Sequence, residues 1–231
     1  MEIRGNIVFP DGVRPARVSV DDQRGCITTV AQMEENPRPD LLVFPGFIDA
    51  HVHAREYPRP PDRDAPAMEK WRAVRRKETF SSCGDAAING GVTLFAAMPN
   101  DPEPPDNQAV YRLKKNAAAS SACPVIVFAA LTLRSEPWAD LPYKVYLDTH
   151  PSSVNFTRWS DLESALARYR GCRVFFHAED PDVLSASPQA GPRWETRPAD
   201  AEVRAVDKVI EFTAKFDLKT HICHMSTKEA V

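Results

Sequence analysis

GFIDAHVHARE, residues 46 to 56, is an apolar run that ends in two histidines one residue apart and then an arginine. In an extended strand successive side chains point to opposite faces, so His51 and His53 point the same way. Two imidazoles on one face are suited to binding one cation. Two histidines at this spacing also occur by chance on a surface or in a core, so the pair alone is weak evidence for a metal site. The stretch therefore predicts a strand that ends at a metal site, if the rest of the chain supplies further ligands.

Length and charge exclude several classes of protein. With 231 residues and 25.8 kDa, the chain can bury the core of one large domain, with or without a small appendage. Its 29 Lys and Arg residues against 32 Asp and Glu give a formal net charge of -3, and no long basic block is present. We therefore expect neither a nucleic acid nor a membrane as partner, and a small molecule as substrate.

The cysteines and the N-terminus indicate the compartment. The 5 cysteines are an odd number, are widely scattered and lie partly in apolar runs, which favours reduced core thiols over a disulfide framework. No basic segment leads into an apolar one at the N-terminus, and the longest apolar run, Cys123 to Leu131, is far shorter than the ~20 residues of a membrane span. We expect a soluble, unprocessed, cytoplasmic protein.

The sequence pattern changes near residue 41. Residues 1–41 are short strand-like runs separated by turns, which predicts a small N-terminal β unit. From residue 42 to 231, apolar runs alternate with longer helical patterns, as in βα units around a parallel sheet. Strands are expected at 42–53, 92–100, 124–132, 142–148, 173–178 and 219–225. Helices are expected at Met68–Asn89, Asn107–Ser121, Ser160–Tyr169 and Ala199–Phe216.

About six such strands fit most of an eight-stranded barrel of the TIM type, whose sites form at the carboxyl ends of the strands. The polar residues of interest lie in or at the end of these strands: His51, His53, Asn100, Lys144, His177 and His224. An open doubly wound sheet would instead spread them along a row. The expected fold class is therefore α/β, a partial TIM-type (β/α)8 barrel with a small N-terminal β unit.

Six motifs together resemble the amidohydrolase superfamily, and within it the dihydroorotases that carry an N-terminal β-sandwich segment. They are VFPGFIDAHVHARE (43–56), GGVTLFAAMPN (90–100), YKVYL (143–147), FFHAED (175–180), RPADAE (197–202) and HICHMSTKEA (221–230). The resemblance covers nearly all of the chain. It implies that residues 1–41 are the β-sandwich segment and that residues 42–231 are the metal-dependent hydrolase barrel through its sixth strand.

The resemblance implies two zinc ions bridged by a carboxylated lysine. The implied ligands are His51 and His53 for the first ion, Lys144 as the bridge, and His177 and His224 for the second ion. A lysine captures carbon dioxide only as a neutral amine, so its pKa must be lowered by burial or by nearby positive charge. The sequence around Lys144 is consistent with this condition, because Lys144 is the only charge between Pro142 and Leu147. The alternative for Lys144, less favoured in this pattern, is a lysine that reaches out from a strand end. Without the family pattern, His177 would be interpreted as a packed core histidine.

Neighbouring residues receive lesser roles. His221 has the opposite strand parity from His224, so it is expected to face outward or to lie behind the ligands, and His150 is expected on a solvated loop. Three carboxylates beside the ligands are candidates to orient imidazoles, namely Glu56, Glu179 and Asp180. The proline-rich run YPRPPDRDAP (57–66) is expected to form a stiff loop beside the site, and DTHPSS (148–153) is a candidate lid.

Arg55 and Asn100 indicate the substrate. In dihydroorotases the corresponding arginine and the asparagine of the MPN motif bind the substrate carboxylate, and a guanidinium grips a carboxylate through two parallel hydrogen bonds. Taken singly, Arg55 is equally explained as a surface residue and Asn100 as a turn or cap residue. Together they favour a zinc-dependent dihydroorotase, which interconverts N-carbamoyl-L-aspartate and L-dihydroorotate in pyrimidine biosynthesis.

Two other functions stay open at this stage. One is an allantoinase- or dihydropyrimidinase-like cyclic amidohydrolase, whose substrates lack that carboxylate. The other is a non-catalytic dihydroorotase homologue that acts as an assembly partner of aspartate transcarbamoylase. A homodimer is also open.

The resemblance places the general base, an aspartate, at the end of an eighth strand beyond Val231. Three accounts are open: part of a longer protein, which is favoured, a fragment completed by another chain, or a remnant that no longer catalyses. We expect little or no activity from residues 1–231 alone.

Overall fold

The computed structural model describes residues 1–35, 40–56, 78–101, 103–149 and 152–231. The chain divides into two compact units, Met1–Phe47 and Ile48–Val231. The division follows Phe47, whereas the sequence analysis places a boundary after residue 41; the assignment of two domains stays a prediction.

The first unit is a four-stranded sheet in the order β3-β2-β1-β4. Its strands are β1 (Glu2–Phe9), β2 (Gly12–Asp21), β3 (Cys26–Gln32) and β4 (Leu42–Val43). The first three strands pair antiparallel, and β4 runs parallel to β1. Ile7, Ala16 and Val18 are buried and form the small core of this unit.

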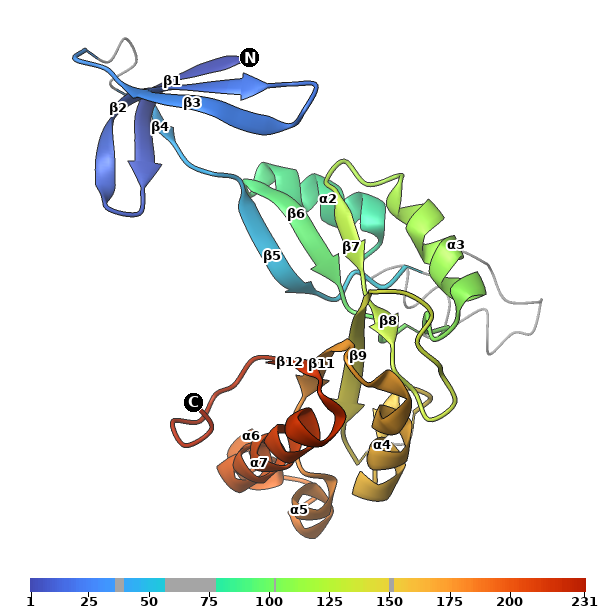
Figure 1. Ribbon diagram of the computed structural model, residues 1–231. Coiled ribbons are helices and arrows are strands. Elements are labelled where there is room, and N and C mark those ends of the chain that lie inside the picture. The colour runs from blue at the N-terminus through green and yellow to red at the C-terminus, as the bar shows by residue number, and fades with distance from the viewer. Residues whose placement is uncertain (36–39, 57–77, 102, 150–151) are drawn as a thin grey trace. The chain divides into compact units, whose positions relative to one another are not determined.

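The second unit contains a series of strands that follow chain order (Figure 1). They are β5 (Phe47–Val52), β6 (Val92–Ala97), β7 (Val125–Val127), β8 (Ala129–Ala130), β9 (Pro142–Leu147), β11 (Arg173–His177) and β12 (Lys219–Ile222), with a short β10 (Asn155–Phe156) beside β9. β6 pairs with β7, and β8, β11 and β10 each pair with β9, all in parallel. β12 is the parallel neighbour of β11.

Phe128 links the two parallel sheets of this unit. It separates β7, which pairs with β6, from β8, which pairs with β9, and its N–H donates to the carbonyl of Ala97 at 3.2 Å. β7 and β8 are thus two halves of one barrel strand, and the order becomes β5, β6, β7/β8, β9, β11, β12. This is the partial TIM-type barrel that the sequence predicts, and the fold class is confirmed.

Four of the described helices overlap the helices expected from the sequence, and two short ones, Pro181–Ala186 and Arg193–Thr196, lie where no helix is expected. The helices are α2 (Phe80–Asn89), α3 (Gln108–Ala118), α4 (Trp159–Leu166), the 3-10 turn η1 (Ala167–Tyr169), α5 (Pro181–Ala186), α6 (Arg193–Thr196) and α7 (Ala199–Phe216). Thr79 starts α2 with a capping box, and Asn107 caps α3. α7 matches its predicted range because Pro198 precedes it and Asp217, with φ 53°, turns the chain after it. The expected helix from Met68 extends into residues that lie outside the described ones.

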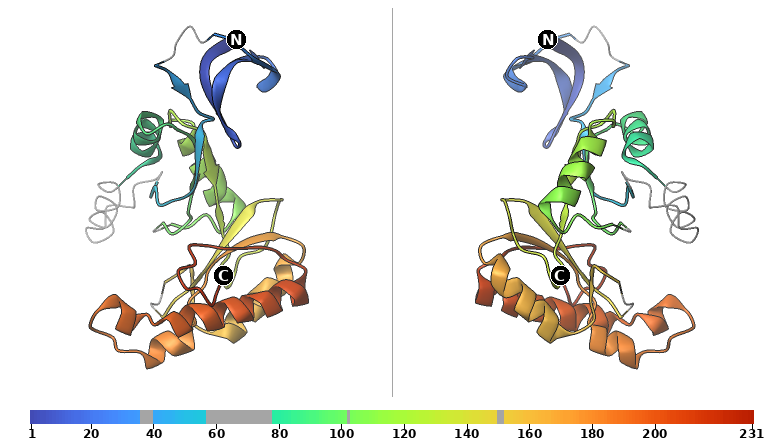
Figure 2. Two further views of the ribbon diagram at one scale, coloured as in Figure 1. Left: turned by 90° about the vertical axis from the view of Figure 1, so that its left-hand side faces the viewer. Right: turned by 90° about the vertical axis from the view of Figure 1, so that its right-hand side faces the viewer.

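Helices cover the outer face of each part of the arc (Figures 1 and 2). α2 and α3 pack on β6 and β7, where Phe80 and Phe95 are buried in one cluster. α4 and α7 pack on β9 and β11, with Leu162, Val174 and Phe212 in the largest cluster. Burying a side chain of this size contributes about 1.5–3 kcal/mol. This packing fixes the strands, so the residues at their carboxyl ends have defined positions.

All cysteines are free, and Cys83, Cys123 and Cys223 are buried. Among the described residues, no helix has the length and apolar character needed to cross a membrane.

Candidate active site

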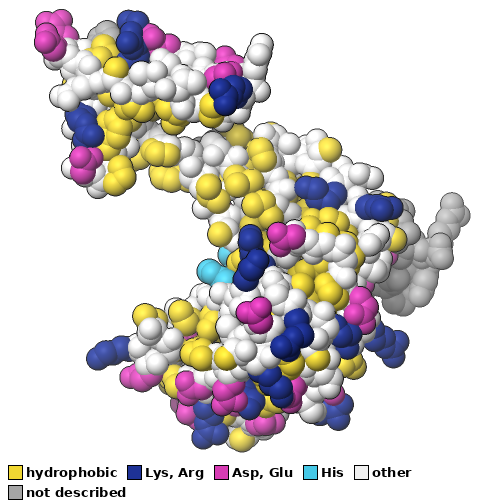
Figure 3. All heavy atoms as spheres, in the orientation of Figure 1, with side chains coloured by type: hydrophobic (Ala, Val, Ile, Leu, Met, Phe, Trp, Pro, Cys, Tyr) yellow, Lys and Arg dark blue, Asp and Glu magenta, His cyan; other side chains and the backbone are white. Residues whose placement is uncertain are grey.

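A cavity of about 1020 Å³ opens within the second unit at the carboxyl ends of the strands. Its lining includes every predicted metal or substrate residue except Lys144: His51, His53, Arg55, Asn100, His177 and His224. In the space-filling view, histidine side chains reach the surface beside a basic side chain (Figure 3). The structure therefore brings together residues from four separate strand ends.

The four imidazoles form a continuous series. The ring centroids of His53 and His51 are 5.2 Å apart, those of His51 and His224 are 5.2 Å apart, and those of His224 and His177 are 4.8 Å apart. His51 and His53 lie on the same face because they are two residues apart at the end of an extended strand.

Burial favours the neutral form of three of these imidazoles, those of His51, His53 and His224, because it lowers their pKa values. Burial, followed by the charge of Lys144 and by the neighbouring His53, lowers the pKa of His51 to about 4. The pKa of His53 is lowered mainly by burial, against the opposing effect of its hydrogen bond to Asn100, and the pKa of His224 is lowered by burial and by His177. Because a metal binds the neutral form of histidine, this environment suits a cation at neutral pH.

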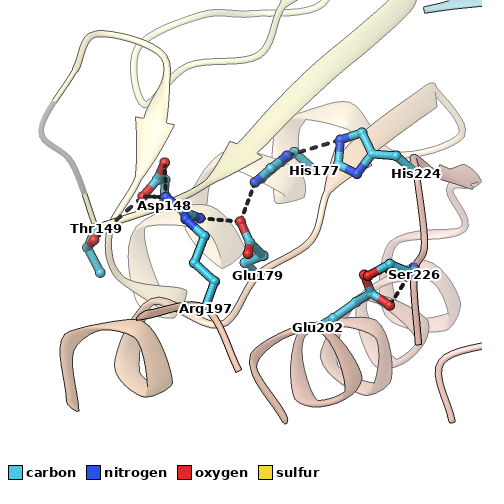
Figure 4. A network of polar contacts seen from close by, with 8 residues as sticks. All are labelled: Asp148, Thr149, His177, Glu179, Arg197, Glu202, His224 and Ser226. Atoms are coloured by element: carbon cyan, nitrogen blue, oxygen red, sulfur yellow. Dashed lines mark hydrogen bonds and ion pairs between the residues drawn. The ribbon is translucent and has the colours of Figure 1, made fainter. Parts of the chain in front are cut away.

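His177 is held by a chain of charged groups (Figure 4). Its Nε2 lies 2.8 Å from Glu179 Oε2, and Glu179 in turn contacts Arg197, whose other nitrogen lies 3.2 Å from Asp148. A carboxylate behind a histidine fixes its tautomer, so Nδ1 of His177 keeps its lone pair. That Nδ1 faces Nε2 of His224 at 3.1 Å. Two zinc–nitrogen bonds of about 2.0–2.1 Å at a tetrahedral angle place their nitrogens about 3.3 Å apart, so this pair fits one shared ion.

His53 has a corresponding partner. Its Nδ1 lies 2.7 Å from Asn100 Oδ1, so the ring donates to the amide oxygen. This leaves Nε2 of His53 with a lone pair and leaves the amide NH2 of Asn100 as a donor. Asn100 therefore orients a candidate metal ligand as well as lining the cavity.

Lys144 is fully buried in β9. Its Nζ lies 2.9 Å from Cys223 Sγ, and burial lowers its pKa, against the opposing effect of Cys223. Lys144 is not among the described residues that line the cavity. Its charge nevertheless lowers the pKa of His51, His53 and His224, so it lies close behind them. Carboxylation would require Nζ to leave Cys223.

In the part of the chain that the structure describes, no three His, Cys, Asp or Glu side chains converge as a ready-made site for one ion. His51 lies as far from His224 as from His53, so the ring distances alone do not divide the four histidines between two ions. Four neighbouring imidazoles fit a metal centre, and a second ion would need a further ligand, which a carboxylated Lys144 would supply.

Glu202 of α7 holds the loop that carries His224. His224 has φ 40°, a left-handed conformation that costs a residue with a side chain about 1–3 kcal/mol. The carboxylate of Glu202 accepts hydrogen bonds from both the backbone and the hydroxyl of Ser226, at 2.9–3.0 Å (Figure 4). It also accepts hydrogen bonds from the backbone and the hydroxyl of Thr227, at 2.7–2.8 Å. Burial alone would raise the pKa of Glu202, but these hydrogen bonds together lower it. Glu202 thus fixes the turn that aims His224 at His177.

A buried ion pair lies behind Arg55 and Asn100. Lys114 of α3 and Asp101 are 2.9 Å apart, with 0% and 3% of their side chains exposed, and Lys114 also donates to the carbonyl of Glu56. Burial raises the pKa of Asp101 to about 6, against the attraction of Lys114 and Arg55. The pair ties the segment after β5 to the segment after β6.

Sequence reasoning missed several of these residues. It quoted RPADAE without giving a role to Arg197 or Glu202, and it gave none to Asp101, Lys114 or Tyr146. Strand alternation places Tyr146 on the same face as Lys144, so the sequence could have indicated that Tyr146 lies near the site. Lys114 has no such signal, because it is one of several polar residues on an amphipathic helix.

The remaining expectations have mixed outcomes. Of the three carboxylates proposed to orient imidazoles, Glu179 contacts His177, whereas Glu56 accepts from the N–H of Phe80 and Asp180 caps α5. His221 packs against the ring of Phe175, at 4.8 Å between centroids. His150 and the run 57–66 lie outside the described residues, as does part of the loop 148–153.

Comparisons with known proteins agree with this geometry. The profile of the amidohydrolase family matches residues 42–229, so the chain belongs to the amidohydrolase family. It is similar to a protein named dihydroorotase from Archaeoglobus fulgidus, at 26% identity over 99% of this chain and 54% of that protein. It is also similar to an allantoinase from Streptomyces avermitilis, at 29% identity over 97% of this chain and 52% of that protein.

Solved structures show the same fold. The L-hydantoinase of Arthrobacter aurescens superimposes with a TM-score of 0.74 at 16% identity, over 97% of this chain and 52% of that one. A D-hydantoinase superimposes with a TM-score of 0.67 at 19% identity, over 98% of this chain and 52% of that one. The chain thus spans about half the length of the relatives that it matches.

Proposed function

We propose that the protein containing these residues is a zinc-dependent dihydroorotase, which interconverts N-carbamoyl-L-aspartate and L-dihydroorotate. The observation that carries the proposal is the placement of Arg55 and Asn100 in one cavity with four neighbouring imidazoles. The similarity to proteins named dihydroorotase supports it.

The metal would be held by protein groups that already have suitable chemistry. Members of the amidohydrolase superfamily are typically metal-dependent. We assign His51 and His53 to one ion, His177 and His224 to the other, and the carboxylated Lys144 to both. Zinc at such a site supplies Lewis-acid activation of water and of a carbonyl group.

The chain's own residues bind and orient the substrate. Arg55 supplies a guanidinium for the carboxylate of dihydroorotate, and the amide NH2 of Asn100 supplies a further donor. Glu179 and Glu202 keep His177 and His224 in position through the contacts described above. The general base, an aspartate on an eighth strand in this proposal, is not among residues 1–231, so we expect these residues alone to turn over little substrate.

The alternative is a cyclic amidohydrolase whose substrate lacks the carboxylate. The similarity to an allantoinase favours this candidate. The non-catalytic role beside aspartate transcarbamoylase is less well supported, because the implied ligands of the first six strands are all present. A homodimer stays a prediction.

Turnover by the protein that contains residues 1–231 separates the candidates. We expect hydrolysis of L-dihydroorotate and cyclisation of N-carbamoyl-L-aspartate to exceed turnover of dihydrouracil, hydantoin and allantoin. Arg55→Met should raise KM for dihydroorotate about 10- to 100-fold, because a hydrogen bond to a charged group contributes about 1.5–3 kcal/mol. Arg193→Met is the matched control, since Arg193 lines the same cavity. Preferred turnover of allantoin or hydantoin, unaffected by Arg55→Met, would refute the dihydroorotase assignment.

A further inference from the structure

Two residues that line the cavity each carry a buried polar atom with no hydrogen-bond partner among the described residues: Oδ1 of Asp101 and the hydroxyl of Tyr146. Both residues are 8% exposed. Most buried polar atoms are hydrogen-bonded, because leaving one unpaired is unfavourable. Two such residues lining one cavity therefore indicate groups that a ligand would satisfy.

The surroundings of Asp101 define what it can bind. Its Oδ2 is paired with Lys114 at 2.9 Å, which leaves Oδ1 as a hydrogen-bond acceptor. A carboxylate repels an anionic group and attracts an N–H donor. Asp101 is therefore unsuited to the carboxylate of a substrate and suited to an amide N–H.

Tyr146 supplies the opposite polarity. It stands two residues after Lys144 in β9, and its ring lies 6.2 Å from that of His177. A phenol is protonated at neutral pH and donates its hydrogen to a carbonyl oxygen. The hydroxyl of Tyr143, on the same strand, is by contrast fully hydrogen-bonded: it accepts from Trp138 N–H at 3.0 Å and donates to the Ala139 carbonyl at 3.0 Å.

An acceptor and a donor in one cavity match the polar edge of a cyclic amide, where an N–H stands beside a carbonyl. We propose that Asp101 and Tyr146 form a second recognition element, in which Asp101 accepts from the ring N–H of the substrate and Tyr146 donates to a ring carbonyl. This inference rests on the proposed function only in that the ligand is a cyclic amide. It is independent of the carboxylate that Arg55 would bind.

The test uses Tyr146→Phe in the protein that contains residues 1–231, with Tyr143→Phe as the matched control on the same strand. The measurements are calorimetric affinity and, where turnover occurs, KM for L-dihydroorotate and for dihydrouracil, which shares the ring but lacks the carboxylate. Thermal unfolding is recorded for each variant. We expect Tyr146→Phe to weaken both ligands by a similar factor of about 5- to 50-fold without lowering Tm, because it removes an unpaired hydroxyl. Tyr143→Phe should lower Tm and leave both affinities unchanged.

The outcomes distinguish failure of the recognition element from failure of the dihydroorotase assignment. If Tyr146→Phe leaves both affinities unchanged, or lowers Tm as much as Tyr143→Phe does, the inference is overturned while the proposed function stands. If the protein prefers dihydrouracil or hydantoin and Tyr146→Phe weakens them, the inference is supported and the dihydroorotase assignment fails. If none of these cyclic amides binds to the unaltered protein, both fail.

Discussion

Lys114→Met should be strongly destabilising at neutral or alkaline pH. Lys114 is fully buried and neutralises Asp101, whose side chain is 3% exposed. The pKa of Asp101 is raised from 3.8 to about 6 even with Lys114 present. At about 1.4 kcal/mol per pKa unit, keeping this carboxyl ionised already costs about 3 kcal/mol. Removing one partner of a buried ion pair costs a further ~3–5 kcal/mol, which is the effect we expect at pH 8.

The loss of folding stability caused by Lys114→Met should be smaller at acidic pH. Because the pKa of Asp101 is higher in the folded than in the unfolded state, the stability that its protonation provides is present below about pH 4 and is lost as pH rises through about 6. In Lys114→Met the pKa of Asp101 should rise further, because the lysine that lowers it is gone. The buried carboxyl is then protonated at pH 5, and the loss of stability there should be at most about 2 kcal/mol.

Urea unfolding of residues 1–231, followed by the helical circular-dichroism signal, measures this effect, because the described helices all lie in the second unit. Lys115→Met is the control, since Lys115 is exposed on the same helix and its replacement should change stability by less than about 0.5 kcal/mol. Asp101→Asn combined with Lys114→Met should recover much of the loss. Equal midpoints for Lys114→Met and Lys115→Met at pH 8, or a penalty that does not depend on pH, would refute the reasoning.

Three further results are expected. Glu179→Ala should weaken zinc binding about 10- to 100-fold in a chelator competition, because the partner of His177 is lost; an unchanged affinity would exclude that role. Glu202→Ala should speed hydrogen exchange at the amides of Ser226 and Thr227, which lose their acceptor, and unaltered exchange there would show that the loop is held by other contacts. His51 should take up a proton only as pH falls toward 4, because burial lowers its pKa to about 4; an NMR titration of the metal-free protein in which His51 is protonated around pH 6.5 would contradict this.

The sequence predicts most of the barrel strands because apolar runs are local signals. The expected strand 42–53 is wrong in one respect: it is two strands, β4 and β5, that belong to different sheets. The helix Ala199–Phe216 has its predicted bounds because Pro198 and Asp217 punctuate it. The break at Phe128 between β7 and β8 has no comparable signal, since it depends on which neighbour each half-strand pairs with.

The candidate site is predictable only in part. Alternation and strand ends indicate His51, His53, His177 and His224, which the structure gathers around one cavity. The hydrogen bond between His53 and Asn100, the ion pair of Lys114 and the contact of Lys144 with Cys223 join segments far apart in the chain. Such contacts follow from tertiary packing, and no local pattern encodes them.

The most direct test is the metal content of purified residues 1–231 after zinc reconstitution in bicarbonate, compared with Lys144→Ala, His177→Ala and the control His221→Ala. The account predicts about two zinc ions per chain in the unaltered protein and in His221→Ala, and about one or fewer in Lys144→Ala and His177→Ala. A metal content that is zero throughout, or that is the same in all four proteins, would contradict it.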